Sequence, residues 1–372
     1  MKIVINTAHQ RFGGAVQVAL SFINECCNFP QHQYHIWVGT GLKESIQEDK
    51  FSSNFSFCYF DFGEITLIKS FRINGVLKKL EKQLNPDCII STSGPTYFHS
   101  NAPQIIGYNL PLYIYPESPF LKSLSVYRQL RFRIKRILHY YYFKRDATAF
   151  VVQTDDVNER VRKALATEKV FTVTNTYNNF YNNRQAYPPK LPAPKPGKNR
   201  LLTISSYYAH KNLEIIPDVL AELKRRGRNN IEFVLTLKEV DFKSKIGTEI
   251  ENILNIGPVK PAECPSLYAE CDIMFLPTLA ECFSASYPEA MVMGKPIITT
   301  DLGFARSICG EAALYFEPQN AVAAADAIEK LLNDDTLWGD LVQKGRERLK
   351  VFDTPAGRAK KYLELCKQLT QE

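Results

Sequence analysis

Two glutamates flank a predicted strand-to-helix turn in the segment PTLAECFSASYPEAM, residues 277–291. The continuous apolar run at 273–276 before it predicts a buried strand. Pro288 favours the first turn of a following helix, so Glu281 is expected in the loop and Glu289 near the helix start. Free backbone N–H groups at a helix start can hold an anion, and a carboxylate beside them can accept hydrogen bonds from hydroxyls. This combination is typical of a sugar-nucleotide site; an acidic capping turn without function is the alternative.

Short apolar runs alternate with helical patterns along both halves of the chain. In the first half, strands are predicted at 2–6, 35–38, 88–91, 104–108, 149–152 and 170–173. In the second half, strands are predicted at 201–205, 231–237, 253–256, 273–276, 296–299 and 313–316, with helices that include 320–332 and 336–349. Strands that alternate with helices predict parallel sheets covered on both faces. We therefore expect an α/β fold of two doubly wound domains, with ligands beyond the carboxyl ends of the strands.

A proline-rich stretch, AYPPKLPAPKPGKN, separates the two halves. Prolines cannot join a helix interior or a central strand, so this stretch is interpreted as a surface linker. Its prolines are Pro188, Pro189, Pro192, Pro194 and Pro196. We expect an N-terminal domain at 1–178, a linker at 179–199, a C-terminal domain at 200–354, and a final helix at 355–372 that packs back on the N-terminal domain.

Composition sets the broad class of the protein. A chain of 372 residues, 45% hydrophobic and 23% charged, predicts a globular protein with more than one core. The net charge of +7 would tolerate an acidic partner. Nine cysteines without a CxxC pair indicate reduced thiols in a cytosolic protein. The first residues lack the apolar core of a signal peptide, and no run of 18 apolar residues predicts a membrane span.

The glutamate segment resembles the donor-binding region of glycosyltransferase family 4. The resemblance rests on Glu281 and Glu289 with Phe283 between them, on GKPII at 294–298, and on GEAALYF at 310–316. It implies the GT-B fold, in which two Rossmann-like domains face each other across a cleft. It also implies transfer of a sugar from a UDP-, GDP- or ADP-sugar.

Other segments extend this resemblance over nearly the whole chain. SSYYAHKNL at 205–213 resembles a second donor motif of the family. Asn175 and Phe180 resemble its domain-crossing segment, and Gly13 and Gly14 its N-terminal glycine loop at the donor.

Residue roles follow from the resemblance. Lys211 would neutralise the diphosphate, Glu281 would bind hydroxyls of the transferred sugar, and Glu289 would bind the ribose. The backbone N–H groups of Phe283, Ser284 and Ala285 would hold the phosphates. A second loop, with Gly257 and Val259, would lie against the base. The family retains anomeric configuration and usually needs no metal, in agreement with the absence of a DxD triplet. The departing phosphate would take the acceptor's proton, so no cofactor and no side-chain base are expected.

The sequence departs from the family pattern at two positions. Ser206 stands where the family often has an arginine, and Ser284 stands where it usually has a glycine. The first change removes a cation from the leaving group, and His210 or Arg306 are the candidates to replace it. On the acceptor side, STSGPTYFH suggests Gly94, Thr96 and His99, although an ordinary turn is an equal interpretation there.

The segment 118–145 carries eight Lys and Arg and no acidic residue. As a helix, it would place Tyr127, Leu130, Ile134, Ile137, Leu138 and Tyr141 on one face, which is expected to pack on the N-terminal domain. Phe132 and Tyr140 would lie among the basic residues Arg128, Arg131, Arg133, Lys135 and Arg136. Aromatic side chains amid cations suit an anionic membrane surface, and a solvated basic face is the alternative. We therefore expect peripheral attachment to the cytoplasmic face of the inner membrane, with a glycan or lipid-linked acceptor in bacterial surface-polysaccharide synthesis.

Other classes of function remain open from the sequence. They are a nucleotide-sugar epimerase of the same fold and a non-catalytic carbohydrate- or polyanion-binding relative. Nucleic-acid binding is disfavoured because no aromatic RNA signature is present. An NAD-dependent dehydrogenase is disfavoured because no GxGxxG follows the first strand.

Overall fold

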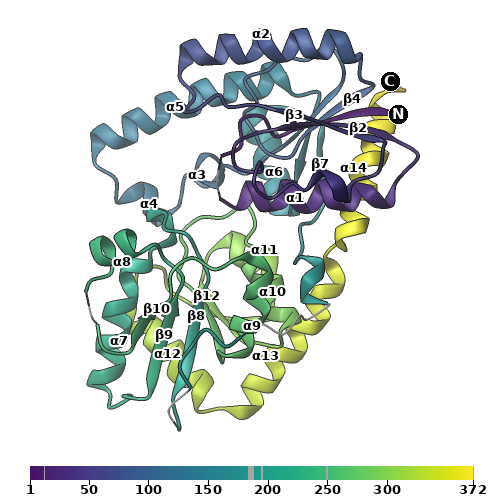
Figure 1. The fold of residues 1–372 in the computed structure, drawn as a ribbon. Coiled ribbons are helices and arrows are strands. Elements are labelled where there is room, and N and C mark those ends of the chain that lie inside the picture. Colours follow the sequence, from purple (N-terminus) through teal and green to yellow (C-terminus); the bar gives the residue numbers. More distant parts are fainter. Residues whose placement is uncertain (12, 183–187, 194–195, 249, 372) are drawn as a thin grey trace. The chain divides into compact units, whose positions relative to one another are not determined.

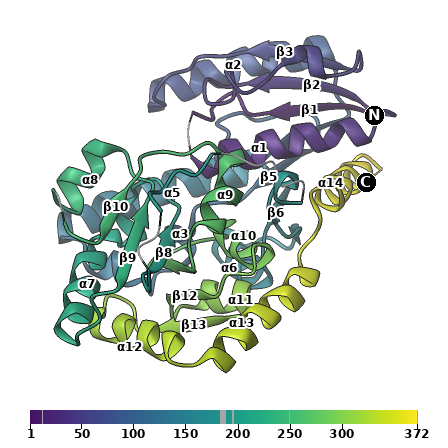
Figure 2. The same cartoon turned by 60° about the horizontal axis from the view of Figure 1, so that its bottom comes forward.

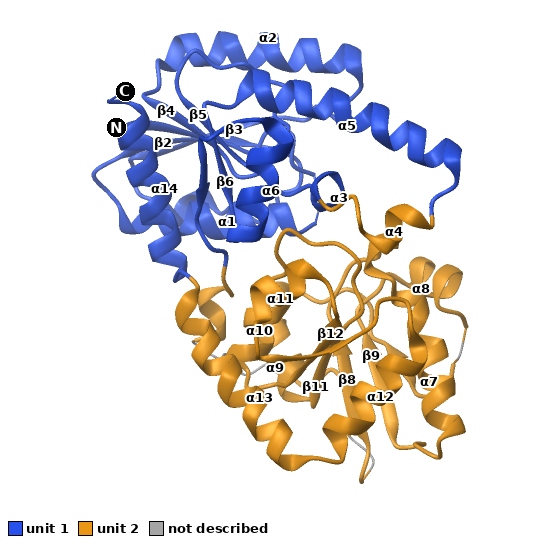
Figure 3. Cartoon of the chain, turned by 180° about the vertical axis from the view of Figure 1, so that it is seen from behind, with its two compact units in different colours: residues 1–114, 124–175, 353–372 blue, residues 115–123, 176–352 orange. Residues whose placement is uncertain are grey.

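The computed structural model describes residues 1–11, 13–182, 188–193, 196–248 and 250–371, which form two compact units (Figure 3). Unit 1 comprises Met1–Ile114, Leu124–Asn175 and Asp353–Glu372, and unit 2 comprises Tyr115–Ser123 and Thr176–Phe352. The chain therefore changes unit after residue 175, before the proline-rich stretch. It also enters unit 2 once earlier, over nine residues that the sequence assigned to the N-terminal domain.

Unit 1 contains a parallel sheet with the strand order β3-β2-β1-β4-β5-β6-β7 (Figure 1). Its strands are β1 (Lys2–Asn6), β2 (Gln33–Val38), β3 (Phe55–Tyr59), β4 (Cys88–Ser91), β5 (Gln104–Gly107), β6 (Ala149–Val152) and β7 (Val170–Thr172). Its helices are α1 (Gly14–Glu25), α2 (Leu67–Leu84), α3 (Pro111–Ile114), α5 (Val126–Asp146), α6 (Asp155–Leu165) and α14 (Pro355–Leu369). The strand order reverses between β1 and β4, so the loops after these two strands open at a position where doubly wound sheets bind ligands.

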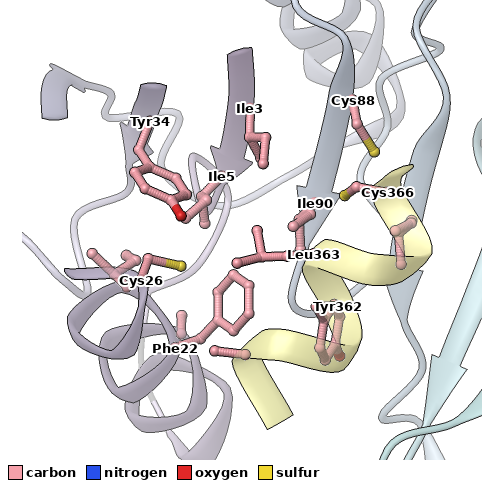
Figure 4. Close-up of a cluster of buried hydrophobic side chains, with 14 of the residues drawn as sticks. Ile3, Ile5, Phe22, Cys26, Tyr34, Cys88, Ile90, Tyr362, Leu363 and Cys366 are labelled. Atoms are coloured by element: carbon pink, nitrogen blue, oxygen red, sulfur yellow. The ribbon is translucent and has the colours of Figure 1, made fainter. Parts of the chain in front are cut away.

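The core of unit 1 contains side chains from both ends of the chain, from β1 and α1 and from α14 (Figure 4). Ile3 and Ile5 of β1 and Ile90 of β4 are fully buried beneath α1 and α14. The rings of Phe22 in α1 and Tyr362 in α14 lie 5.0 Å apart. The C-terminal helix is therefore part of the unit 1 core.

Unit 2 contains a second parallel sheet with the order β10-β9-β8-β11-β12-β13. Its strands are β8 (Asn199–Thr203), β9 (Ile231–Leu235), β10 (Ile253–Asn255), β11 (Ile273–Leu276), β12 (Ile297–Thr300) and β13 (Ala313–Phe316). Its helices are α4 (Pro119–Lys122), α7 (Ile216–Arg225), α8 (Glu239–Lys245), α9 (Cys264–Ala269), α10 (Ser286–Val292), α11 (Gly303–Cys309), α12 (Ala321–Leu332) and α13 (Asp335–Arg348). Helix α12 packs against α7 and α13 (Figure 2). Here the strand order reverses between β8 and β11.

The described part of the proline-rich stretch packs on unit 2. The backbone N–H of Leu191 donates to the Glu270 carboxylate at 2.8 Å, and that of Lys190 donates to the same group at 3.1 Å. Leu191 is buried. Pro194 lies outside the described residues.

Helices α2 and α5 lie side by side in unit 1 (Figures 1 and 3), and a 2.8 Å hydrogen bond joins Ser70 Oγ to the Tyr142 hydroxyl. The prediction that the apolar face of α5 packs on the N-terminal domain is wrong. Its side chains are instead exposed: Tyr127 by 73%, Leu130 by 57%, Ile134 by 61%, Ile137 by 68%, Leu138 by 38% and Tyr141 by 58%. Only the C-terminal part of α5 is buried, at His139, Tyr142, Phe143 and Asp146.

The two aromatic residues predicted to face a membrane lie against α3 instead. The ring of Phe132 is 5.0 Å from the ring of Tyr113, and the Tyr140 hydroxyl donates to the Tyr113 carbonyl at 2.8 Å. The basic residues Arg128, Arg131, Arg133 and Lys135 are exposed, while Arg136 is partly covered over the Tyr140 ring. Among the described residues, none of the helices combines the length and hydropathy needed to cross a membrane.

Candidate functional site

The loops that follow β8 and β11 meet at the carboxyl end of the unit 2 sheet. The Leu279 N–H donates to the His210 carbonyl at 2.7 Å, and the Thr278 hydroxyl lies 3.3 Å from the same oxygen. The Thr300 hydroxyl, at the end of β12, donates to the Thr278 carbonyl at 2.6 Å. These bonds fix the two loops to each other at the reversal of strand order. Lys211 and Glu281 lie on them.

Lys211 and Glu281 form an ion pair across this junction, with their side chains 14% and 11% exposed. The Lys211 ammonium donates to Glu281 Oε1, and the Thr278 hydroxyl donates to the same oxygen at 3.1 Å. A fixed cation can neutralise a phosphate, and the carboxylate beside it can accept hydrogen bonds from sugar hydroxyls. The structure thus brings together the residue predicted to neutralise the diphosphate, Lys211, and the residue predicted to bind the transferred sugar, Glu281.

Glu289 lies in the first turn of α10, among tyrosine side chains. The Tyr268 hydroxyl is 3.5 Å from Glu289 Oε2 and 3.2 Å from the Ser286 carbonyl. Burial raises the pKa of Glu289 to about 7, and the hydroxyls of Tyr181 and Tyr268 partly oppose that shift. The Tyr181 and Tyr268 rings are 6.2 Å apart. Sequence reasoning missed both tyrosines, because Tyr268 resembles an ordinary core position and Tyr181 is distant in the chain.

Five further residues predicted to bind the donor also lie in unit 2. Ser284 is buried, Ala285 precedes α10, and the Phe283 ring lies 5.7 Å from the Phe352 ring. Gly257 follows β10 at φ 75°, a backbone conformation that favours glycine, and Val259 is partly buried. Their contacts with a donor stay predictions.

His210 and Arg306, the two candidates to replace the missing arginine, differ in their surroundings. Burial lowers the pKa of His210, Lys211 lowers it further, and Glu281 opposes both effects. Without a bound diphosphate the His210 imidazole is therefore mainly neutral at neutral pH, and its role at the leaving group stays a prediction. Its ring stacks at 5.7 Å on that of Tyr208.

Arg306 is already paired. It donates to both carboxylate oxygens of Asp301, at 2.5 and 2.8 Å, and its guanidinium lies 4.3 Å from the centre of the Tyr315 ring. Ser206 itself is exposed. Lys211 therefore stands as the best-placed cation at the junction of the two loops.

Unit 1 contains a pocket of about 290 Å³ at its own reversal of strand order. Its lining comes mainly from the loops after β1 and β4 and the residues after β5: His9, Gln10, Arg11, Ala15, Gly63, Ile65, Ser93, Gly94, Pro95, Tyr97, Asn109 and Leu110. Gly94 is required by packing, because a Cβ there would lie 2.5 Å from Phe143 Cε1 and 2.6 Å from Ile106 Cγ2.

The polar groups of this pocket are mostly uncharged. Burial lowers the pKa of His9 to about 4, so the imidazole is neutral at physiological pH. The Gln10 amide donates to the Thr92 hydroxyl at 2.9 Å. Within the described part of the chain, Gln10 Oε1 and Asn109 Oδ1 have no hydrogen-bond donor. Neutral donors and acceptors of this kind suit the hydroxyls of a sugar.

Two predicted acceptor residues lie outside the pocket lining. Thr96 is fully buried, and its hydroxyl is 3.3 Å from the Phe98 carbonyl. His99 is exposed, and its Nδ1 donates to the Arg145 carbonyl at 2.7 Å. Both side chains serve local structure, which corrects their assignment to an acceptor site.

The glycine pair lies at the start of α1. Gly13 caps the helix at φ 85°, and Gly14 is its first residue, directly before the pocket residue Ala15. The part of the chain that the structure describes contains no group of three His, Cys, Asp or Glu side chains that could hold a metal ion.

Comparisons with known proteins agree with this arrangement. Residues 198–334 match the family described as Glycosyl transferases group 1. The phosphatidyl-myo-inositol mannosyltransferase of Mycobacterium leprae is 29% identical over 118 residues, which are 31% of this chain. The matched region spans about a third of the length of that relative, 32%.

Two solved structures match nearly the whole chain. Anabaena HepE, in complex with UDP and glucose, has a TM-score of 0.72 at 14% identity and covers 98% of this chain and 99% of its own. WaaG, a glycosyltransferase involved in lipopolysaccharide biosynthesis, has a TM-score of 0.72 at 15% identity and covers 97% of this chain and 98% of its own. The predicted resemblance is thereby confirmed at two levels: the chain has the GT-B fold over nearly its whole length, and residues 198–334 match the group 1 glycosyltransferase family.

Proposed function

We propose that this protein is a retaining glycosyltransferase that moves a sugar from a nucleotide-diphosphate sugar to a glycan or lipid-linked acceptor. The observation that carries the proposal is the Lys211–Glu281 ion pair at the strand-order reversal of unit 2, where a doubly wound sheet binds nucleotides. HepE, one of the structural neighbours, was crystallised with UDP and glucose. A UDP-, GDP- or ADP-sugar is the expected donor.

The proposed mechanism needs no metal and no side-chain base. Lys211 neutralises the diphosphate as negative charge develops on the leaving group. The N–H groups of Phe283, Ser284 and Ala285, just before α10, donate to the phosphates. Glu289 accepts from the ribose hydroxyls, and Glu281 accepts from hydroxyls of the transferred sugar. The departing phosphate takes the acceptor's proton as the acceptor attacks from the same face, so configuration is retained.

The unit 1 pocket is the proposed acceptor site. Its volume of about 290 Å³ is near the lower end of small-molecule sites, and its neutral imidazole and amides suit hydroxyl groups. The curated relative is named for a mannosyl transfer to a phosphatidylinositol, and WaaG for a role in lipopolysaccharide synthesis. These names support an acceptor at a membrane and a role in bacterial surface-polysaccharide synthesis.

We also infer that α2 and α5 form a surface for an anionic membrane. Ile68 and Phe71 of the neighbouring helix α2 are also exposed, by 83% and 70%, in addition to the apolar face of α5. Both helices also carry exposed basic residues: Lys69, Arg72, Arg128, Arg131, Arg133 and Lys135.

An apolar surface bordered by cations matches the acyl boundary and anionic headgroups of a bilayer. We assign the membrane contact to the exposed side chains of α5 in place of Phe132 and Tyr140, because those two rings lie against Tyr113. The expected location is peripheral, at the cytoplasmic face of the inner membrane.

Labelled UDP-, GDP- and ADP-sugars, incubated with and without a panel of free and lipid-linked sugar acceptors, test the proposed function. A glycosyltransferase consumes one donor and does so much faster with its acceptor. Conversion of the sugar without any acceptor would indicate an epimerase instead. Donor binding without turnover across the panel would indicate a binding protein.

A further inference from the structure

Residues Tyr115–Ser123 connect α3 and α5, which both belong to unit 1, yet they pack as part of unit 2. We call them the connecting segment. Its Tyr115 is buried, with its ring 6.0 Å from the ring of Phe304 in α11. The segment is therefore built into unit 2.

Ser118 of the connecting segment bonds directly to the loop that carries Glu281. Its hydroxyl donates to the Leu279 carbonyl at 2.8 Å, and both residues are 2% exposed. The N–H of Leu279 is held in turn by the His210 carbonyl at 2.7 Å. Both backbone groups of Leu279 are thus fixed, one by the loop of Lys211 and one by Ser118.

Phe120 contacts the other loop of the same junction. Its ring lies 6.2 Å from the imidazole of His210, in an edge contact, and the same imidazole stacks on the Tyr208 ring at 5.7 Å. The connecting segment therefore contacts His210, which directly precedes Lys211, and Leu279, which lies two residues before Glu281.

We propose that Ser118 is a positioning residue for sugar transfer, acting through Leu279 on the Glu281 carboxylate. This inference rests on the proposed function, because it assigns Ser118 to the geometry of that reaction. A hydroxyl that fixes a buried carbonyl restricts the turn at 278–281, and small displacements of a reacting group reduce turnover strongly. Glu289 lies on α10 and contacts Tyr268 instead, so the ribose site does not depend on this bond.

Ser118→Ala tests the inference, with Ser118→Thr as the variant that keeps a hydroxyl. Ser123→Ala is the matched control, since the Ser123 hydroxyl donates to Phe120 O at 2.8 Å at the exposed end of the same segment. Ser118→Ala is expected to lower kcat on the order of tenfold, with affinity for the free nucleotide changed less than about twofold. Ser118→Thr is expected to restore most of kcat, and Ser123→Ala to match the parent.

Hydrogen exchange of the same variants gives a readout that does not need turnover. Amides at 277–284 are expected to exchange faster in Ser118→Ala, while those of β8 and β9 stay unchanged. Unchanged exchange at 277–284, or an equal loss of nucleotide affinity and kcat, would overturn the positioning role. If the parent protein transfers no sugar, the proposed function fails, and the exchange comparison still decides whether Ser118 holds this loop.

Discussion

The Lys211 ammonium and the Glu281 carboxylate form an ion pair between the loops that follow β8 and β11. Both side chains are largely buried, so each charge depends on the other for compensation. A diphosphate that binds at this junction would share Lys211 with Glu281. In the proposed reaction, the pair would thereby link recognition of the sugar to stabilisation of the leaving group.

Lys211→Ala is expected to lower kcat by about 10²–10³, by analogy with the loss of one donor that stabilises charge in a transition state. Steady-state kinetics with the donor identified in the panel measures this change. Lys243→Ala, on the exposed surface of α8, is the matched control and should behave as the parent does. Full activity of Lys211→Ala would refute its role at the diphosphate.

Glu281→Gln keeps the shape of the side chain but removes its charge. The loss of a charged hydrogen-bond acceptor costs about 1.5–3 kcal/mol, which corresponds to roughly 10- to 150-fold in turnover. The nucleotide without its sugar should bind no more weakly than before, because the contact removed is to the sugar and Lys211 is no longer shared with a carboxylate. A large loss of free-nucleotide affinity with unchanged kcat would contradict this assignment.

Glu289→Gln is expected to weaken nucleotide binding and to change its pH dependence. Since the pKa of Glu289 is raised to about 7, the parent carboxyl is protonated below that pH and accepts fewer hydrogen bonds. Nucleotide affinity of the parent should therefore rise between about pH 6 and 8, by up to tenfold per unit. The variant should bind weakly with a flatter profile, because only the nucleotide's own ionisation remains. Calorimetric titrations that give superimposable profiles would show that Glu289 does not contact the ribose.

Asn109→Ala is expected to raise the KM for the acceptor several-fold, because it removes an acceptor group from the unit 1 pocket. Nucleotide affinity should change less, since most of the residues predicted to bind the donor lie in unit 2. His99→Ala is the control, as His99 lies outside the pocket lining. Equal effects of both substitutions on the acceptor KM would place the acceptor elsewhere.

Arg128→Gln, Arg131→Gln, Lys135→Gln and Arg136→Gln combined are expected to release the protein from vesicles that contain anionic lipid. Each basic residue near such a surface contributes about 1 kcal/mol, screened by salt. Ile134→Ser with Ile137→Ser should weaken binding as well, because the exposed apolar face is lost. Lys360→Gln with Lys367→Gln on α14 removes charge elsewhere and should leave sedimentation with vesicles unchanged. If the parent protein binds neutral and anionic vesicles equally, or binds neither, the proposal that α2 and α5 form a membrane surface is wrong.

The sequence predicted the doubly wound architecture because buried parallel strands are continuous apolar runs, and β1, β4, β6, β11 and β13 have the predicted bounds. Strand β3 was missed, because its residues are only partly buried at the edge of the sheet. The turn that carries Glu281 and Glu289 could also be predicted from the sequence, because its residues are close together in the chain and follow a strand. Periodicity grouped the apolar residues of α5 correctly but could not show which side of the helix is covered.

Contacts between distant segments could not be predicted. Nothing in residues 115–123 indicates that Ser118 bonds to Leu279, because that contact depends on the path of the chain between the units. The same holds for Tyr181 beside Glu289 and for Asp301, whose carboxylate pairs with Arg306. Such partners decide the charge and orientation of site residues.

Proton NMR of one reaction mixture tests the central claim most directly. The parent protein, the donor selected from the panel, its acceptor and excess EDTA are observed through the anomeric signals of donor and product. The account predicts a new glycosidic signal with the anomeric configuration of the donor, formed only with acceptor present and at an unchanged rate in EDTA. A product of inverted configuration, or an epimerised sugar that forms without acceptor, would contradict it.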